Sequence, residues 1–476
     1  MTATADPALP TPPADLPRTV GELRAAGHRY RTVKQELREN LLARMREGSI
    51  RFPGIVGYDD TVLPEVERAL LAGHDMVLLG ERGQGKTRLI RSLVSLLDEW
   101  TPVIAGSELN EHPLHPISPA ARRRAAEAGD DLPVGWLHRS MRYGEKLATP
   151  DTSVGDLIGD VDPIRVAEGR TLGDPETIHF GLVPRTNRGI FAVNELPDLA
   201  ERIQVALLNV LEERDIQVRG YQLRLPLDLL LVASANPEDY TNRGRIITPL
   251  KDRFGAEIRT HYPVDLELEL ALVRQEAALV APVPDHVLEV VVRFARAVRE
   301  SPSVDARSGV SARFAIAAAE TVAASALRRA GLVGEAEPVA RVGDAVSVAS
   351  TLRGKVEFES GEEGREIEIL AHLLRTATAE TFRDRLTGLD LSGFTSLVGD
   401  GAVIETGELV GAEELLRQVG TVPGLAKVLD RLDLGDAPTP GEAAAGIEFV
   451  LEGLHLTRRL AKDLTDDGRT RYGGRN

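Results

Sequence analysis

The sequence predicts an α/β fold in which a parallel β-sheet carries helices on both faces and is followed by an all-helical segment and a mostly helical C-terminal region. Between residues 51 and 263, short continuous apolar runs alternate with helical stretches, as buried parallel strands joined by helices do. One of these runs leads directly into a glycine-rich loop and a helix, the arrangement of a phosphate-binding unit. Helical patterns dominate after residue 264 and place helices beyond the sheet.

The chain has 476 residues, of which 42% are hydrophobic and 27% charged, the composition of a globular protein with several domains. Its net charge of −16 argues against a nucleic-acid partner, because such binding needs a basic surface. The N-terminus has no apolar signal core and no run approaches the roughly 20 apolar residues that span a bilayer, so we expect no membrane association. The absence of cysteine excludes disulfides and fits a cytoplasmic protein.

Composition divides the chain into four stretches. Residues 1–50 comprise a proline-rich tail, expected to be disordered, and leading helices. The α/β domain is expected over 51–263, with an insertion near 101–150. A helical lid follows over 264–330, and residues 331–476 form a mostly helical region to which the sequence assigns no role.

Three apolar runs predict strands of the sheet, at residues 76–79, 190–193 and 229–235. The helix after the second run has apolar residues at spacings of three and four, which gives one stripe facing the core. These residues are Leu196, Leu199, Ile203, Leu207 and Val210. Residues 215–225 predict a strand, a turn and a second strand ahead of the third run.

The first run ends in Gly80-Glu-Arg-Gly-Gln-Gly-Lys-Thr87, which matches the phosphate-binding pattern GxxxxGK[ST]. Gly80, Gly83 and Gly85 allow backbone amides to turn toward a phosphate without side-chain clashes. Lys86 is expected to reach the β- and γ-phosphates, and Thr87 to give a hydroxyl ligand to Mg²⁺. The predicted cofactors are therefore ATP and Mg²⁺.

The second run ends in Asn194 and Glu195. P-loop ATPases usually carry Asp-Glu here, with the Asp holding Mg²⁺ through water and the Glu activating the attacking water. Glu195 is thus the candidate base. Asn194 is a candidate metal-side residue that keeps an acceptor oxygen but lacks the charge a hard cation favours, so we expect slow hydrolysis and a high Mg²⁺ requirement. Asp198 could compensate if it faces the site.

Several motifs, taken in their order, resemble those of magnesium-chelatase I subunits and MoxR ATPases, which are AAA+ proteins. Besides the phosphate loop they are Phe52-Pro-Gly-Ile-Val-Gly57, Asn187-Arg-Gly189, Ser234-Ala-Asn236-Pro-Glu238 and Leu250-Lys-Asp-Arg-Phe-Gly255. The resemblance covers residues 50–330 and implies an AAA+ P-loop core, a helical lid and a homo-oligomeric ring, as a hexamer.

The resemblance also implies roles for four residues, each with a plainer alternative. Val56 would line the adenine pocket, or is an ordinary core valine. Asn236 would polarise the attacking water, or is a turn former. Arg253 would be the arginine finger that acts on a neighbouring subunit's ATP, or forms a surface salt bridge. Arg313 would be a second sensor, or lies on a helix surface.

The function that this resemblance implies is an ATP-hydrolysing motor that remodels or activates a partner protein. The partner in this group typically carries a von Willebrand factor A domain, and since no DxSxS pattern is present here, it would be a separate chain. One alternative is a nucleotide-gated scaffold with little turnover, because of Asn194. Another is an AAA+ transcription activator, which would need a GAFTGA loop and a basic helix-turn-helix that the sequence lacks.

Carboxylates and histidines gather in the expected insertion, namely Glu108, Glu111, His112, His115 and His138. A zinc site is one interpretation. The spacing shows no helical ligand pattern, which favours loop histidines instead.

Overall fold

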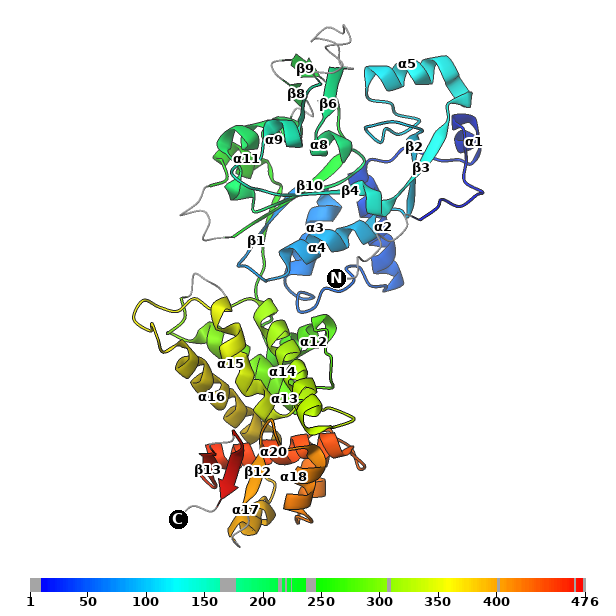
Figure 1. Ribbon diagram of the computed structural model, residues 1–476. Helices are drawn as coiled ribbons and strands as arrows, with labels where there is room; N and C mark the ends of the chain where they lie inside the picture. The colour runs from blue at the N-terminus through cyan, green and yellow to red at the C-terminus, as the bar shows by residue number, and fades with distance from the viewer. Residues whose placement is uncertain are drawn as a thin grey trace. The chain divides into compact units, whose positions relative to one another are not determined.

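The computed structural model describes residues 10–162, 177–212, 216–218, 221–223, 225–236, 245–305, 310–399, 403–465 and 468–473. The chain divides into two compact units, Met1–His261 and Tyr262–Asn476, whose elements are labelled in Figure 1. Across the described ranges, no helix combines the length and the apolar character needed to cross a membrane.

A five-stranded parallel sheet forms the centre of the first unit, in the order β11-β1-β10-β7-β4. The strands are β1 (Met76–Leu79), β4 (Tyr143–Leu147), β7 (Gly189–Asn194), β10 (Leu229–Ala235) and β11 (Ala256–Arg259). Every residue of β1, β7 and β10 is buried, which explains why apolar runs predicted these three. The predicted parallel sheet is confirmed.

The two edge strands, β4 and β11, did not show as apolar runs. Polar and apolar residues alternate in β11, and Glu145 and Lys146 stand side by side in β4, because an edge strand is only partly covered. Strand β4 lies inside the range expected as an insertion, so residues 143–147 belong to the core sheet. Outside the sheet, β2 (Trp100–Ile104) pairs with β3 (Val134–His138), and α5 (Pro119–Ala128) lies between them in sequence.

Alternate strand residues enter two separate cores, as strand geometry requires. Met76 and Leu78 pack with α2 (Val33–Glu47), α3 (Val62–Ala72) and α4 (Lys86–Ser92) on one face. Val77 and Leu79 pack on the other face with α9 (Glu201–Glu212) and α11 (Thr248–Arg253). The helices on both faces are visible in Figure 1.

Smaller elements complete the first unit. They are α1 (Val20–Ala25), η1 (Leu93–Leu96), η2 (Gly129–Asp131), η3 (Arg139–Arg142), α6 (Val154–Leu157), β5 (Gly159–Val161), β6 (Ile178–Phe180), α8 (Leu182–Arg185) and η5 (Leu196–Asp198). Strands β8 (Ile216–Val218) and β9 (Tyr221–Leu223) pair antiparallel, in the stretch predicted as strand, turn and strand.

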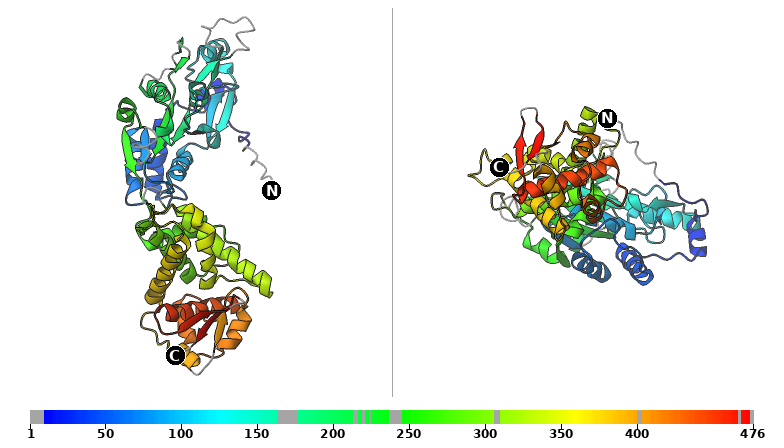
Figure 2. Two further views of the ribbon diagram at one scale, coloured as in Figure 1. Left: turned by 60° about the vertical axis from the view of Figure 1, so that its left-hand side comes forward. Right: turned by 90° about the horizontal axis from the view of Figure 1, so that it is seen from below.

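The second unit is mostly helical, as predicted. Its helices are α12 (Leu266–Glu276), α13 (Asp285–Glu300), α14 (Ala312–Val333), η6 (Val342–Ala345), α15 (Val346–Leu352), η7 (Arg353–Lys355), α16 (Glu366–Leu386), α17 (Ser392–Gly399), α18 (Ala412–Val419), α19 (Leu425–Arg431) and α20 (Pro440–Leu456). A three-stranded antiparallel sheet of β12 (Ile404–Thr406), β14 (Thr470–Gly473) and β13 (Ala461–Leu464) follows, with β13 and β14 red in Figure 2. The sequence did not predict this sheet.

Buried ion pairs cross the core of the second unit. Arg329 bonds Asp344 at 3.0 Å, and Arg341 bonds Glu335 at 2.7 Å. Both arginines are almost fully buried. Because buried charges are costly without partners, these residues depend on one another.

Candidate nucleotide site

Several of the predicted site residues lie where the central strands end. Gly80 follows β1, Asn194 and Glu195 close β7, and Asn236 follows β10. Parallel sheets bind ligands at this carboxyl edge, because neighbouring loops diverge there and leave a crevice. The strand order therefore brings together residues that are far apart in sequence.

The loop after β1 needs glycine at three positions. Gly83 and Gly85 have φ values of 76° and 79°, which favour glycine over residues with a Cβ. A Cβ on Gly80 would collide with the Thr260 hydroxyl and the Gln84 side-chain oxygen. The same pattern of glycines lets a phosphate approach the backbone closely.

Two side chains brace this loop from outside. The Thr260 hydroxyl donates to Gln84 Oε1 at 2.8 Å. The Tyr58 hydroxyl lies against the Gln84 carbonyl and 3.0 Å from the His261 carbonyl. Burial raises the pKa of Tyr58 to about 12, so this hydroxyl keeps its proton and acts as a donor at neutral pH.

Lys86 is buried and lies over its own loop. Its ammonium donates to the carbonyls of Gly80 and Glu81, the latter at 2.9 Å, and to Asn236 Oδ1 at 2.9 Å. These acceptors are neutral oxygens. A phosphate would be a stronger partner, since hydrogen bonds between ionised groups are roughly twice as strong as neutral ones.

The Asn236 amide joins the lysine to the candidate base. Its oxygen accepts from Lys86, and its Nδ2 donates to Glu195 Oε2 at 2.7 Å. Glu195 has φ 57° and ψ 47°, a left-handed conformation that is rare outside glycine and concentrates at functional sites. Its backbone N–H donates to Ser234 Oγ at 3.4 Å. One amide therefore connects the P-loop lysine with Glu195.

Asn194 occupies the side of the site next to Thr87. The Thr87 hydroxyl is 3.5 Å from Asn194 Oδ1, and the Ser234 hydroxyl donates to the same oxygen at 3.1 Å. These are hard oxygen donors of the kind that Mg²⁺ binds. The residues thus fit a phosphate held by the loop and a divalent cation beside Thr87.

Glu145, which sequence reasoning missed, completes this side. Asn194 Nδ2 donates to Glu145 Oε1 at 2.6 Å. Arg91 holds the same carboxylate with two bonds of 2.8 and 3.0 Å, and the Tyr143 hydroxyl adds a third at 2.9 Å. Burial would raise the pKa of Glu145, but the bonds from Arg91 and Tyr143 outweigh burial and lower that pKa. The residues of β4 form neither an apolar run nor a regular alternation, so no local pattern marks Glu145.

Four other residues were predicted for the site, and of these Asp198 bonds Glu195 through its backbone. Val56 is half-buried in the stretch before α3. Arg253 is partly exposed and pairs with Glu212 at the end of α9. Arg313 is exposed near the start of α14, in the second unit. Asp198 donates its backbone N–H to the Glu195 carbonyl at 2.9 Å, whereas the carboxylate that bonds Asn194 is that of Glu145.

The histidines and carboxylates near residues 108–138 have structural partners. The Glu111 carboxylate accepts the backbone N–H groups of Ile117 and Ser118. His112 Nδ1 accepts the Leu114 N–H at 3.0 Å, which leaves the His112 ring proton on Nε2, 3.3 Å from His28 Nε2. Within the ranges that the structure describes, no three such side chains are grouped to hold a metal ion. The contacts do not support the zinc interpretation.

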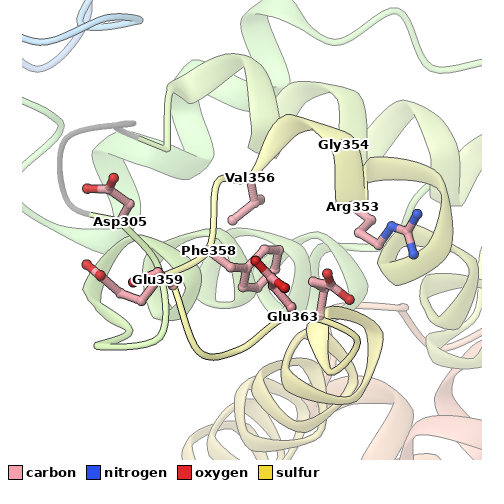
Figure 3. A pocket seen from close by; sticks show the side chains of 9 residues that line it. Asp305, Arg353, Gly354, Val356, Phe358, Glu359 and Glu363 are labelled. Atoms are coloured by element: carbon pink, nitrogen blue, oxygen red, sulfur yellow. The ribbon is translucent and has the colours of Figure 1, made fainter.

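A hollow of about 670 Å³ lies in the second unit and is drawn in Figure 3. Its lining includes Asp305, Glu359 and Glu363 beside Arg353. The excess of carboxylates would repel a phosphate group. The hollow is therefore unsuited to a nucleotide.

A profile of the Sigma-54 interaction domain matches residues 171–253. Magnesium-chelatase subunit ChlI-1 of Arabidopsis thaliana is 29% identical over 232 residues, which is 48% of this chain and 51% of that protein. The ChlI subunit of Oryza sativa subsp. indica is 30% identical over 233 residues, 48% of this chain and 52% of that protein.

A solved structure of the complex between magnesium-chelatase subunits BchI and BchD contains a chain that is 22% identical, with a TM-score of 0.36. The match covers 67% of this chain and 98% of that one. The chain spans about half the length of the curated relatives it matches.

The parallel sheet and the phosphate loop form a core with the AAA+ P-loop fold, and the match to the Sigma-54 interaction domain falls within this first unit. The chain resembles the I subunits of magnesium chelatase over about half of its length.

Proposed function

We propose that the chain binds and hydrolyses ATP as the motor subunit of an AAA+ assembly. The observation that carries this proposal is the Asn236 amide, which contacts both Lys86 and the candidate base Glu195. A protein without a catalytic site would need neither the left-handed backbone of Glu195 nor a buried Lys86 joined to it through Asn236. The arrangement is suited to phosphoryl transfer to water.

In this proposal each residue acts through the contacts it already has. Gly80, Gly83 and Gly85 shape the loop, and Lys86 exchanges its neutral oxygens for phosphate. Thr87 and Asn194 would hold Mg²⁺, which would neutralise charge on the phosphates. Glu195 orients and deprotonates the attacking water, while Asn236 holds the Glu195 carboxylate in place.

We further propose a homo-oligomeric ring, as a hexamer, in which Arg253 acts on the ATP of a neighbouring subunit. Its guanidinium is partly exposed, and its partner Glu212 also lies at the surface, so the pair can open at little cost. Val56 would line the adenine pocket, and Arg313 would act as the second sensor from a lid formed by residues 264–330.

The motor would work in the cytoplasm on a separate partner that carries a von Willebrand factor A domain, in a chelatase-like or MoxR-like manner. The likeness to magnesium-chelatase I subunits supports this class. The names of these relatives refer to magnesium chelation, and this chain spans about half of their length.

A transcription activator is the second candidate, because the Sigma-54 interaction profile matches residues 171–253. That class needs a GAFTGA loop to contact its target, and the sequence has none. Binding of the purified chain to a sigma factor would favour this candidate over a von Willebrand factor A partner.

The test of the ATP proposal is nucleotide binding and turnover by the full chain. Lys86→Ala should abolish high-affinity ATP binding, because the Lys86 ammonium is the group expected to bind the β- and γ-phosphates. Lys427→Ala, at an exposed position on α19, is the matched control and should bind ATP normally. Equal ATP affinity in the Lys86→Ala and unsubstituted chains, by calorimetry, would overturn the proposal. Binding without turnover would support the scaffold alternative.

A further inference from the structure

The carboxylate of Glu145 and the amide of Asn194 meet on one face of the sheet. In β7, Ile190 and Ala192 pack against the helices on the α4 side, and Asn194 continues the same alternation. Glu145 stands opposite Ala192 in the β4–β7 register and so shares that face. Since α4 begins with Lys86 and Thr87, the phosphate loop enters its helix on this same face.

The contacts of Asn194 settle which way its amide points. Its nitrogen donates to Glu145, which can only accept while ionised. Its oxygen is consequently turned toward the hydroxyls of Thr87 and Ser234. Without an acceptor at position 145, the amide could rotate and present its N–H₂ group to Thr87. An N–H₂ group cannot bind a cation or accept from a metal-bound water.

Glu145 itself is fixed by three donor bonds. Arg91 holds both carboxylate oxygens, and Tyr143 donates to one of them. The two-bond pair with Arg91 offsets most of the Glu145 charge locally. Glu145 can therefore affect a cation near Thr87 mainly by orienting the Asn194 side chain. Its own negative charge contributes less.

We propose that Glu145 is a positioning residue of the nucleotide site, which turns the Asn194 oxygen toward the metal beside Thr87. This inference rests on the proposed ATP function. It also explains the unusual residue at 194: beside Glu145, an Asp would place two carboxylates within hydrogen-bond distance with no proton between them. An amide is the side chain that can accept on the Thr87 side and donate on the Glu145 side.

The experiment is a titration of Mg²⁺ against binding of a fluorescent, non-hydrolysable ATP analogue. Glu145→Ala should raise the Mg²⁺ concentration for half-maximal binding by about 10-fold or more, since losing an outer partner of a metal ligand costs roughly 10–100-fold in metal affinity. Glu145→Gln keeps an acceptor oxygen and should stay within about threefold of the unsubstituted chain. Glu127→Ala, at an exposed position on α5, is the control and should change nothing.

Analogue binding without Mg²⁺ separates positioning from general damage, because Lys86 and the loop support it. It should be equal in the unsubstituted chain, Glu145→Ala and Glu145→Gln. An unchanged Mg²⁺ midpoint in Glu145→Ala, or a Gln variant as impaired as the Ala variant, would overturn the inference. Absence of Lys86-dependent binding in the unsubstituted chain would instead overturn the ATP proposal.

A second pair of variants, with substitutions at both position 194 and position 145, tests the inference if Glu145→Ala fails to fold. Asn194→Asp alone should lower the melting temperature in metal-free buffer, because two carboxylates face each other. Adding Glu145→Gln supplies an N–H₂ donor to the carboxylate introduced at position 194 and should restore the melting temperature. Additive effects of the two substitutions would contradict coupling between these positions.

Discussion

Asn236 Nδ2 donates to Glu195 Oε2 across 2.7 Å, while the oxygen of the same amide accepts from Lys86. The amide can make both bonds only in one orientation. The residue that holds the Glu195 carboxylate therefore also bonds the Lys86 ammonium.

Asn236→Ala should retain ATP binding and lose turnover. The carboxylate of Glu195 would no longer be held, and general-base catalysis contributes roughly 10²–10⁴-fold. We expect kcat to fall by about 100-fold with KM nearly unchanged, the pattern of an interaction used in the transition state. Steady-state kinetics check this prediction. A rise in KM at constant kcat would contradict it.

Glu195→Gln and Arg253→Ala should each be nearly inactive alone, because an arginine finger is worth roughly 10³–10⁵ in rate. Mixed together, some sites would combine an intact Glu195 with a neighbour's intact Arg253. ATPase activity of the mixture should partly return. No recovery in rings shown by native mass spectrometry to contain both variants would refute action across an interface.

The stability of the second unit should fall as the pH drops below neutral. Burial lowers the pKa of His286 to about 4, beneath its ordinary 6.5, and the ring packs 4.9 Å from that of Phe449. The neutral form is favoured in the fold, so its contribution is complete above pH 6.5 and is lost as the pH falls toward 4. The free energy of unfolding should fall by up to about 1.4 kcal/mol per pH unit because of this one group. Chemical denaturation at pH 7 and pH 5 measures it, and His286→Leu should flatten the dependence.

Asp344→Ala should destabilise the second unit by about 3–5 kcal/mol, because it leaves Arg329 buried without this carboxylate. Asp344 also accepts the Arg341 backbone N–H at 2.8 Å. The exposed pair of Arg365 with Glu368 provides the contrast, and Glu368→Ala should cost less than about 1 kcal/mol. Urea unfolding distinguishes the two, and equal effects would argue against a buried network.

The sequence predicted the central strands because they are apolar throughout, and it located the polar residues that follow them. Since parallel strands end at one edge, Lys86, Glu195 and Asn236 could be expected to meet. The sequence could not predict β4, because this strand has few apolar residues and is held in the sheet by pairing with β7. Treating residues 101–150 as an insertion therefore hid Glu145, and the sequence pointed to Asp198 as the compensating carboxylate. The contact that Glu145 makes depends on strand order, which no local pattern encodes.

Tyr58 has one hydroxyl proton and two carbonyl acceptors, Gln84 in the phosphate loop and His261 at the end of the first unit. A single O–H satisfies one of them at a time. Any shift of the loop toward a phosphate or away from it changes which carbonyl competes better for that proton. The shape of the loop and the position of the His261 carbonyl are therefore linked through one shared donor, and Tyr58→Phe would let each vary without the other.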